Sequence, residues 1–228
     1  NALILSNPVF YEDNVNDSSL KNKDFLPTLE YSKVEGANIE KVLNNNGIEV
    51  HHLSEKDVTI QAFEGIYKYE LIHIATHGFY RTTVPKNEDI QNFIFSSGLY
   101  LSHPFKLSYP HEIQHNPEGY LTSVDLGEYN SDNLILVTLS ACNSSRGWLA
   151  STGEYFGVQR AFFNIGAKFV LSSQWDIEDQ YTSVFMNDFY YSWLEEKDII
   201  NAFKKSQERM KMQYPHPSRW ACFVLHHR

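Results

Sequence analysis

Two apolar segments of similar design constrain this chain more than any other feature of its sequence. The first, LIHIATHG, ends at His77 and Gly78, and the second, LILVTLSAC, ends at Cys142. Each is a β-branched run of strand length, which predicts a buried strand with one reactive side chain at its C-terminal end. If the two strands lie side by side and parallel, an imidazole and a thiol meet at the sheet edge where open α/β folds place their ligand sites.

Strand-like and helical patterns alternate along the chain. The predicted strands cover residues 2–10, 48–53, 70–76, 97–102, 134–141, 167–175 and 220–226. The predicted helices cover residues 31–46, 121–130, 154–166, 179–193 and 198–212, together with a short one that ends at Phe63. This alternation predicts an α/β fold with a mainly parallel central sheet that is covered by helices and joined by right-handed crossovers.

Four residues carry signals for the ends of these helices. Gly47 and Gly166 stand where a C-terminal glycine belongs. Ser54, with Asp57 three residues later, resembles the N-terminal signature of the short helix. Ser123 is the predicted N-cap of the helix that follows it.

Composition limits the class of protein. With 228 residues, of which 42% are hydrophobic, the chain can bury a full core, and one compact domain is expected. Lys and Arg number 19 against 28 Asp and Glu, which gives a net charge of −9 and disfavours nonspecific nucleic-acid binding. No apolar run approaches the roughly 18 residues that span a bilayer, so no membrane partner is expected.

Cysteine usage and the first residues bear on the location of the protein. The chain holds 2 cysteines, Cys142 and Cys222, both in apolar contexts, which gives no disulfide framework and fits a reducing compartment. The start of the chain lacks the basic region of a signal peptide, so the cytoplasm is the expected location. A first residue of Asn instead of Met indicates a piece of a longer protein.

The paired strand ends suggest nucleophilic chemistry. A thiol becomes a useful nucleophile when a neighbouring base takes its proton, and a histidine has a pKa suited to that near neutrality. His77 and Cys142 meet this requirement. The backbone N–H groups of Gly78 and Cys142 are candidate donors to the oxyanion of a tetrahedral intermediate. No Asp or Asn is indicated as an orienting group for the imidazole, and a backbone carbonyl is sufficient for that role.

Packing explains the same residues in another way. A cysteine or a histidine at the end of a buried strand is often a core residue with no chemical role. The two residues together favour catalysis more than either does alone, because both end separate buried strands and both are followed by small or flexible residues. Pattern alone leaves catalysis and packing open.

Five segments, in order along nearly the whole chain, resemble the CHAT domain, a caspase-like cysteine peptidase family related to separase. They are ATHG around His77, SGLYLS, TLSACNSSRG around Cys142, GVQRAFFNIGAKFVLSSQWDIED and WACFVL. The resemblance implies a caspase-like three-layer α/β fold, catalytic roles for His77 and Cys142, Gly78 in the oxyanion hole, and no cofactor or metal. It also implies that residues 1–228 are one CHAT domain from the C-terminal part of a longer protein. Two features depart from the family: Ser144 stands where Thr is common, and the segment between the dyad residues is long.

The resemblance extends to substrate preference. Separase-like relatives carry acids after the strand that follows the cysteine, and these help to bind a basic P1 residue; Asp176 and Asp179 occupy the comparable region. The alternative is that Asp179 favours the N-terminus of the following helix and Asp176 caps it. Trp175 either packs at the sheet edge or lines the substrate pocket. Ser140 completes the predicted substrate-binding residues.

Other histidines favour no metal site. His73 and His77 have a spacing that chelates a metal only on a helix, and on a strand they lie about 13 Å apart. His103, His111 and His115 share one long loop and are expected to be solvated. No P-loop, GxGxxG or GxSxG pattern is present, which disfavours nucleotide-binding and serine-hydrolase alternatives.

The sequence therefore predicts a cysteine endopeptidase that acts on a protein or peptide. By resemblance, its activity is gated by another domain or partner protein in bacterial signalling or defence, and the segment 79–120 is the candidate element that orders on activation. The alternative is a CHAT-like interaction scaffold that is inactive or latent.

Overall fold

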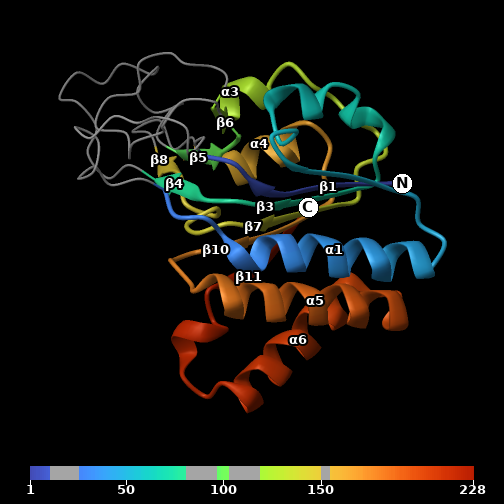
Figure 1. The fold of residues 1–228 in the computed structure, drawn as a ribbon, viewed down its shortest axis with the longest axis vertical. Helices are drawn as coiled ribbons and strands as arrows, with labels where there is room; N and C mark the ends of the chain where they lie inside the picture. Colours follow the sequence, from blue (N-terminus) through green and yellow to red (C-terminus); the bar gives the residue numbers. More distant parts are fainter. Residues whose placement is uncertain (11–25, 81–96, 103–118, 150–154) are drawn as a thin grey trace.

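A six-stranded sheet forms the centre of the molecule. The computed structural model describes residues 1–10, 26–80, 97–102, 119–149 and 155–228. From one edge to the other, the strands are β11 (Phe223–His227), β10 (Phe169–Ser173), β7 (Leu136–Ser140), β3 (Leu71–Ala75), β1 (Ala2–Pro8) and β2 (Val50–Glu55). All neighbours are parallel except β10 and β11 (Figure 1). The predicted α/β class with a mainly parallel sheet is confirmed.

Helices cover both faces of this sheet, which gives three layers (Figure 1). One face carries α1 (Glu30–Asn45) and α5 (Asp179–Glu196), with α6 (Ile199–Gln213) packed on α5 and followed by the 3₁₀ turn η4 (Pro217–Arg219). The other face carries α3 (Ser123–Leu126), α4 (Val158–Asn164) and the 3₁₀ turns η2 (Ile60–Phe63) and η3 (Ile66–Lys68). The long helices begin and end close to their predicted limits.

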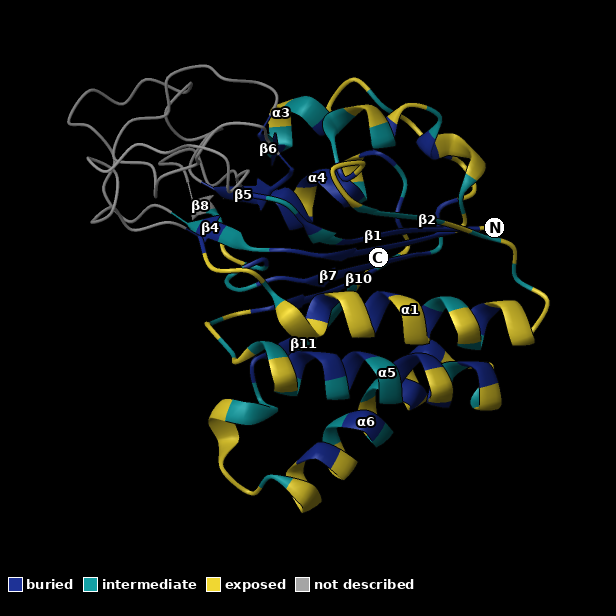
Figure 2. Ribbon diagram, viewed as in Figure 1, coloured by how far each residue is buried: buried dark blue, intermediate teal, exposed yellow. Residues whose placement is uncertain are grey.

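Alternation along the strands explains why the sheet is covered on both faces. In β1, Leu3 and Leu5 point into the core beneath α3 and α4, whereas Ala2 and Ile4 point into the core beneath α1 and α5. All five residues of β3 and of β7 are buried (Figure 2). Strands buried on both faces read as continuous apolar runs, which is how these two appeared in the sequence.

Two smaller sheets lie beyond the C-terminal ends of the parallel strands (Figure 1). One is antiparallel and contains β4 (Gly78–Tyr80), β5 (Ser97–Tyr100) and β6 (Tyr120–Thr122); the other pairs β8 (Trp148–Leu149) with β9 (Tyr155–Phe156). The predicted strand in SGLYLS is confirmed as β5. The helix predicted from residue 154 instead begins at Val158, because the preceding residues pair as β9.

Two of the predicted helix starts are wrong. Ser54 belongs to β2, and the short helix η2 has Thr59 at its N-cap with no side-chain bond. Thr122, rather than Ser123, caps α3 in a capping box with Asp125. The predicted cap lies one position from the observed one for α3 and five positions away for η2, so Ser and Thr signals locate a cap only approximately.

Both predicted C-terminal glycines are confirmed. Gly47 and Gly166 have φ angles of 77° and 124°, in the region that favours glycine. Beside Gly166, the carbonyl oxygen of Ser131 lies 1.9 Å from where a Cβ would stand, so a side chain has no room there.

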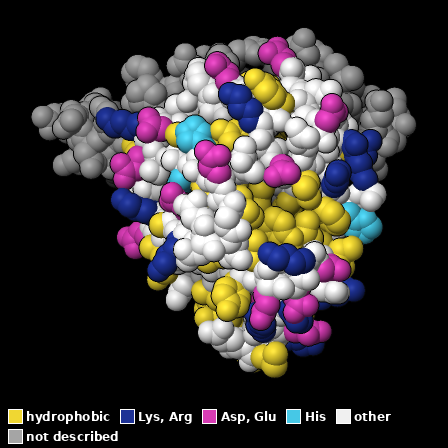
Figure 3. Space-filling model, turned by 90° about the vertical axis from the view of Figure 1, so that its right-hand side faces the viewer, with side chains coloured by type: hydrophobic (Ala, Val, Ile, Leu, Met, Phe, Trp, Pro, Cys, Tyr) yellow, Lys and Arg dark blue, Asp and Glu magenta, His cyan; other side chains and the backbone are white. Residues whose placement is uncertain are grey.

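The face of the molecule where the parallel strands begin is partly apolar. Figure 3 shows apolar side chains gathered near its centre, with acidic and basic side chains around them. In the described ranges, no helix combines the length and apolarity needed to cross a membrane.

Candidate active site

The ends of β3 and β7 bring the two predicted reactive residues to equivalent positions. The strands are parallel neighbours, and their register ends at Ala75 opposite Ser140. The N–H of Thr76 donates to the carbonyl of Ser140 at 3.2 Å, which continues the pairing by one residue. His77 and Cys142 come next on either side. The two strands are therefore adjacent and parallel, as a pairing of His77 with Cys142 requires.

Both residues are tied to the same helical layer. His77 Nε2 bonds the carbonyl oxygen of Pro27 at 2.7 Å, shortly before α1 begins. Cys142 Sγ donates to the carbonyl of Ile177 at 3.6 Å, shortly before α5 begins. The segments that lead into these two helices thus hold the imidazole and the thiol on one side of the sheet.

The Pro27 carbonyl determines which ring nitrogen of His77 carries the proton. A carbonyl only accepts hydrogen bonds, so Nε2 carries the proton and Nδ1 of a neutral ring is left as an acceptor. Burial lowers the pKa of His77, and the bond to Pro27 opposes this in part. The ring of Phe10 packs 5.2 Å from the imidazole, measured between ring centroids. His77 is therefore a neutral base with a fixed orientation at neutral pH.

The environment of Cys142 favours the thiol over the thiolate. Burial raises its pKa most, the bond to Ile177 lowers it, and the charges of Asp176 and Asp179 raise it further. A thiolate at this site therefore needs a base that removes the proton during reaction.

Gly78 lies against the backbone of Cys142. A Cβ at residue 78 would stand 2.1 Å from the carbonyl oxygen of Cys142 and 3.5 Å from the Cβ of Ala141. No side chain fits in that space, so glycine is required by the close approach of two chain segments. This contact places the start of β4 beside the residue predicted to be the nucleophile.

The residues after Cys142 are anchored to neighbouring segments. Asn143 adopts a φ of 55°, and its Nδ2 donates to the carboxylate of Asp176. The buried hydroxyl of Ser144 donates to Leu139 O at 3.2 Å and accepts from Ser173 N at 3.0 Å. The serine hydroxyl therefore supplies both bonds.

The two predicted substrate-binding acids make structural contacts. Asp176 holds Asn143, as described above. Asp179 Oδ2 accepts from Tyr31 N at 2.7 Å, so this carboxylate binds the N-terminus of α1. Burial, followed by the charges of Glu35 and Glu30, raises the pKa of Asp179 to about 6. The alternative that Asp176 caps α5 is wrong, since the N-cap is Glu178.

A cavity of about 480 Å³ opens beside the segment that follows Cys142. Its described lining includes Tyr80, Arg146 and Trp175, and Trp175 also packs against the core beneath α1 and α5. Arg146 Nε donates to Gln174 O at 2.8 Å, and its guanidinium lies 5.8 Å from the centre of the Tyr80 ring. Ser140 is buried and is not part of the described lining.

Sequence reasoning missed Pro27 and Gln174, whose contributions come from backbone carbonyls. Nothing in a side-chain pattern marks a carbonyl that orients an imidazole. His103, His111 and His115 lie outside the described residues, as do 81–96 and 103–118 of the segment expected to order on activation. Across the described ranges, no group of three or more His, Cys, Asp or Glu side chains is placed to hold a metal ion.

Comparison with known proteins assigns the family. The family model of the CHAT domain matches residues 1–227. The chain belongs to the CHAT domain family. This is the caspase-like group of cysteine peptidases that the motifs around the strand ends resemble. The chain is also similar to the crystal structure of caspase-1 from Spodoptera frugiperda, with 13% identity, a TM-score of 0.47, and coverage of 99% of this chain and 87% of that one. No curated protein sequence matches it.

Proposed function

We propose that this CHAT domain is a cysteine endopeptidase in which Cys142 is the nucleophile and His77 the base. The observation that carries the proposal is the register of β3 and β7, which sets the two residues at equivalent positions beyond the paired strand ends. The bond from His77 Nε2 to Pro27 supports it, because the remaining ring nitrogen is free to accept a proton.

The proposed reaction needs no cofactor. His77 Nδ1 takes the thiol proton, and the sulfur attacks the carbonyl carbon of the scissile peptide bond. The N–H groups of Gly78 and Cys142 stabilise the resulting oxyanion. The imidazolium then gives its proton to the leaving amine, which leaves a thioester on Cys142. Water, deprotonated by His77, hydrolyses this thioester and restores the free thiol.

Thiol labelling tests the dyad directly. A peptidyl electrophile should modify Cys142 and spare Cys222, which is buried and has its pKa raised to about 12 by burial. Cys142→Ala should abolish both labelling and peptide cleavage while the fold is retained, and Cys222→Ala should leave both intact. Equal labelling of the two cysteines, or full cleavage activity in Cys142→Ala, would refute the proposal.

Cleavage after Arg or Lys is the proposed specificity. It rests on two carboxylates, Asp176 and Asp179, whose charges act on Cys142. Arg146 lines the cavity, and its positive charge disfavours a basic P1 side chain there. We therefore expect a basic P1 side chain to extend toward Asp176.

A peptide library checks this preference. Asp176→Asn should lower kcat/KM for basic P1 substrates about tenfold, which corresponds to the loss of one charge-assisted hydrogen bond. Asp132→Asn is the matched control, because Asp132 is exposed and precedes β7 at the opposite end of the strand from Cys142. A profile dominated by Asp or by apolar residues at P1 would contradict the proposal.

The second candidate is a latent or inactive interaction module. The observation that favours it is the state of the dyad, in which burial raises the thiol pKa and lowers the imidazole pKa. The two candidates agree if a further domain or partner protein holds the peptidase inactive until it is needed. We propose that this gating serves bacterial signalling or defence in the cytoplasm. Labelling of Cys142 only after a partner is added would identify the latent form.

A further inference from the structure

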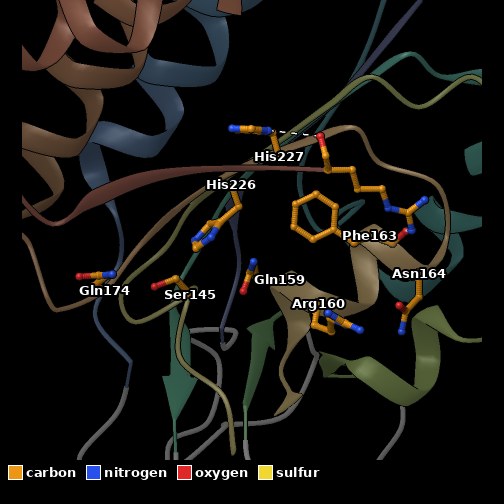
Figure 4. A pocket seen from close by; sticks show the side chains of 9 residues that line it. Ser145, Gln159, Arg160, Phe163, Asn164, Gln174, His226 and His227 are labelled. Carbon is orange, nitrogen blue, oxygen red and sulfur yellow. Dashed lines mark hydrogen bonds between the residues drawn. The ribbon is translucent and has the colours of Figure 1, made fainter. Parts of the chain in front are cut away.

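A second cavity lies on the face of the sheet that carries α4. Its volume is about 620 Å³, and it is bounded by α4, the end of β11 and the segment after Cys142. In Figure 4, His226, Ser145 and Gln159 approach one another, and Arg160 lies next to Gln159 on α4. None of the residues that the peptidase mechanism uses belongs to the described lining.

The cavity is basic although the protein is acidic. Its described lining contains Arg160, His226, His227 and Arg228 and no Asp or Glu, whereas the whole chain has a net charge of −9. Arg160 is exposed on α4, and no hydrogen bond or ion pair to another described residue engages it. Arg228 donates one N–H to the carbonyl of Phe163 and retains further donors. Uncompensated positive charge in a concave surface attracts anions.

One buried polar atom inside the cavity lacks a partner in the described part of the chain. His226 Nε2 is buried and has no hydrogen-bond partner among the described residues. Gln159, which is 8% exposed, lies beside it. A buried polar atom without a partner costs free energy, which a ligand can recover by bonding it.

We propose that this cavity binds a small molecule that carries phosphate groups. The planar fork of an arginine matches phosphate oxygens in pairs, so Arg160 and Arg228 suit a ligand that carries phosphate groups. The volume suits a small organic ligand and far exceeds a single phosphate ion, and the Phe163 ring offers an apolar surface for its uncharged part. Ser145 and Gln174 line both this cavity and the cavity of about 480 Å³. The ligand therefore lies against the segment that follows Cys142.

Calorimetric titration of the full chain with ATP and with inorganic pyrophosphate tests the site without requiring peptidase activity. ATP should bind saturably and more weakly as salt rises. Arg160→Gln should weaken this binding about tenfold, and Arg160→Glu should abolish it. Both variants should fold normally, because residue 160 is exposed.

The control is Lys204→Gln, which removes an exposed positive charge from α6 on the other face of the sheet and should leave binding unchanged. An equal loss of affinity in Lys204→Gln would overturn the proposal, because it would mean nonspecific attraction to positive charge. Failure of both probes to bind would also overturn it, as would binding of an acidic peptide in place of either probe.

Discussion

Gly78 lies where the start of β4 meets the backbone of Cys142, and a Cβ there would stand 2.1 Å from a carbonyl oxygen. Gly78→Ala must therefore move the backbone at Cys142 or β4. We expect at least a tenfold slower reaction of Cys142 with a peptidyl electrophile, and a loss of about 1–3 kcal/mol in the free energy of unfolding. Labelling kinetics and urea denaturation measure the two effects.

Gly127→Ala is the control for this substitution. Gly127 has a φ of −64°, which any residue adopts, and the nearest atom to a Cβ there is 3.2 Å away. Its labelling rate should match that of the unaltered chain. A Gly78→Ala protein that reacts at the same rate would show that the contact has no bearing on the site.

Single residues also show what sequence reasoning can and cannot find in the site. His77, Gly78 and Cys142 were found because each follows a strong strand pattern and carries a side chain, or lacks one, for a chemical reason. Pro27 was not found, because every residue type has the same carbonyl. Asp179 binds a helix N-terminus 148 residues earlier in the chain, and no local pattern reports so distant a partner.

At the scale of elements, Asp179 joins α5 to the first turn of α1, where a carboxylate is stabilised by the helix dipole and the Tyr31 N–H. Burial still dominates and raises its pKa from 3.8 to about 6. The folded protein therefore binds a proton in this interval that the unfolded chain does not. The resulting stabilisation is fully present below pH 3.8 and is lost as the pH rises through about 6.

Asp179→Asn removes this titration. The difference in the free energy of unfolding between the two proteins should change between about pH 4 and 6 and stay constant above that range. Urea denaturation at several pH values measures it. A constant difference across the whole range would show that Asp179 titrates normally.

Four elements meet in a buried polar chain beneath the candidate site. Glu35 Oε1 of α1 lies 2.9 Å from His73 Nε2 of β3, and both side chains are fully buried. His73 Nδ1 bonds Thr138 Oγ1 of β7 at 2.6 Å, which bonds Tyr190 OH of α5 at 2.7 Å. His73 and Thr138 face each other in the same strand pair that ends at His77 and Cys142.

Glu35→Ala leaves the buried His73 Nε2 without the carboxyl oxygen that lies 2.9 Å from it. The expected loss is about 3–5 kcal/mol in the free energy of unfolding, against about 1–2 kcal/mol for Tyr190→Phe, which removes the neutral bonds of the hydroxyl to Thr138 and His73. Denaturation curves of both variants provide the comparison. Glu30→Ala, at the exposed start of α1, is the control and should change stability little. Equal effects of Glu35→Ala and Glu30→Ala would show that the buried pair contributes nothing.

The elements themselves were largely predictable from the sequence. Strands β3 and β7 were evident because burial on both faces leaves continuous β-branched runs, and α1, α5 and α6 because each buries one face. Short elements were less predictable: β8 and β9 were missed, and the caps of η2 and α3 were misplaced. Such elements depend on pairing with distant segments, which outweighs their own weak propensities.

At the scale of the whole molecule, the two cavities adjoin one another through shared lining residues. Ser145 and Gln174 line both of them, and Ser145 N donates to Ser173 O at 2.8 Å. A phosphate-bearing ligand in the basic cavity therefore restrains the residues that follow Cys142. In the arrangement described, the thiol is bonded to Ile177 and is not ionised.

Because a restrained segment leaves this arrangement less often, ATP should slow the reaction of Cys142 with a peptidyl electrophile. The effect should saturate with the affinity measured by calorimetry, and it should be absent in Arg160→Gln, in which labelling without ATP is unchanged. Labelling rates with and without ATP measure the coupling. An equal change in Arg160→Gln would show that ATP acts elsewhere, and no change in the unaltered chain despite binding would show that the two cavities are independent.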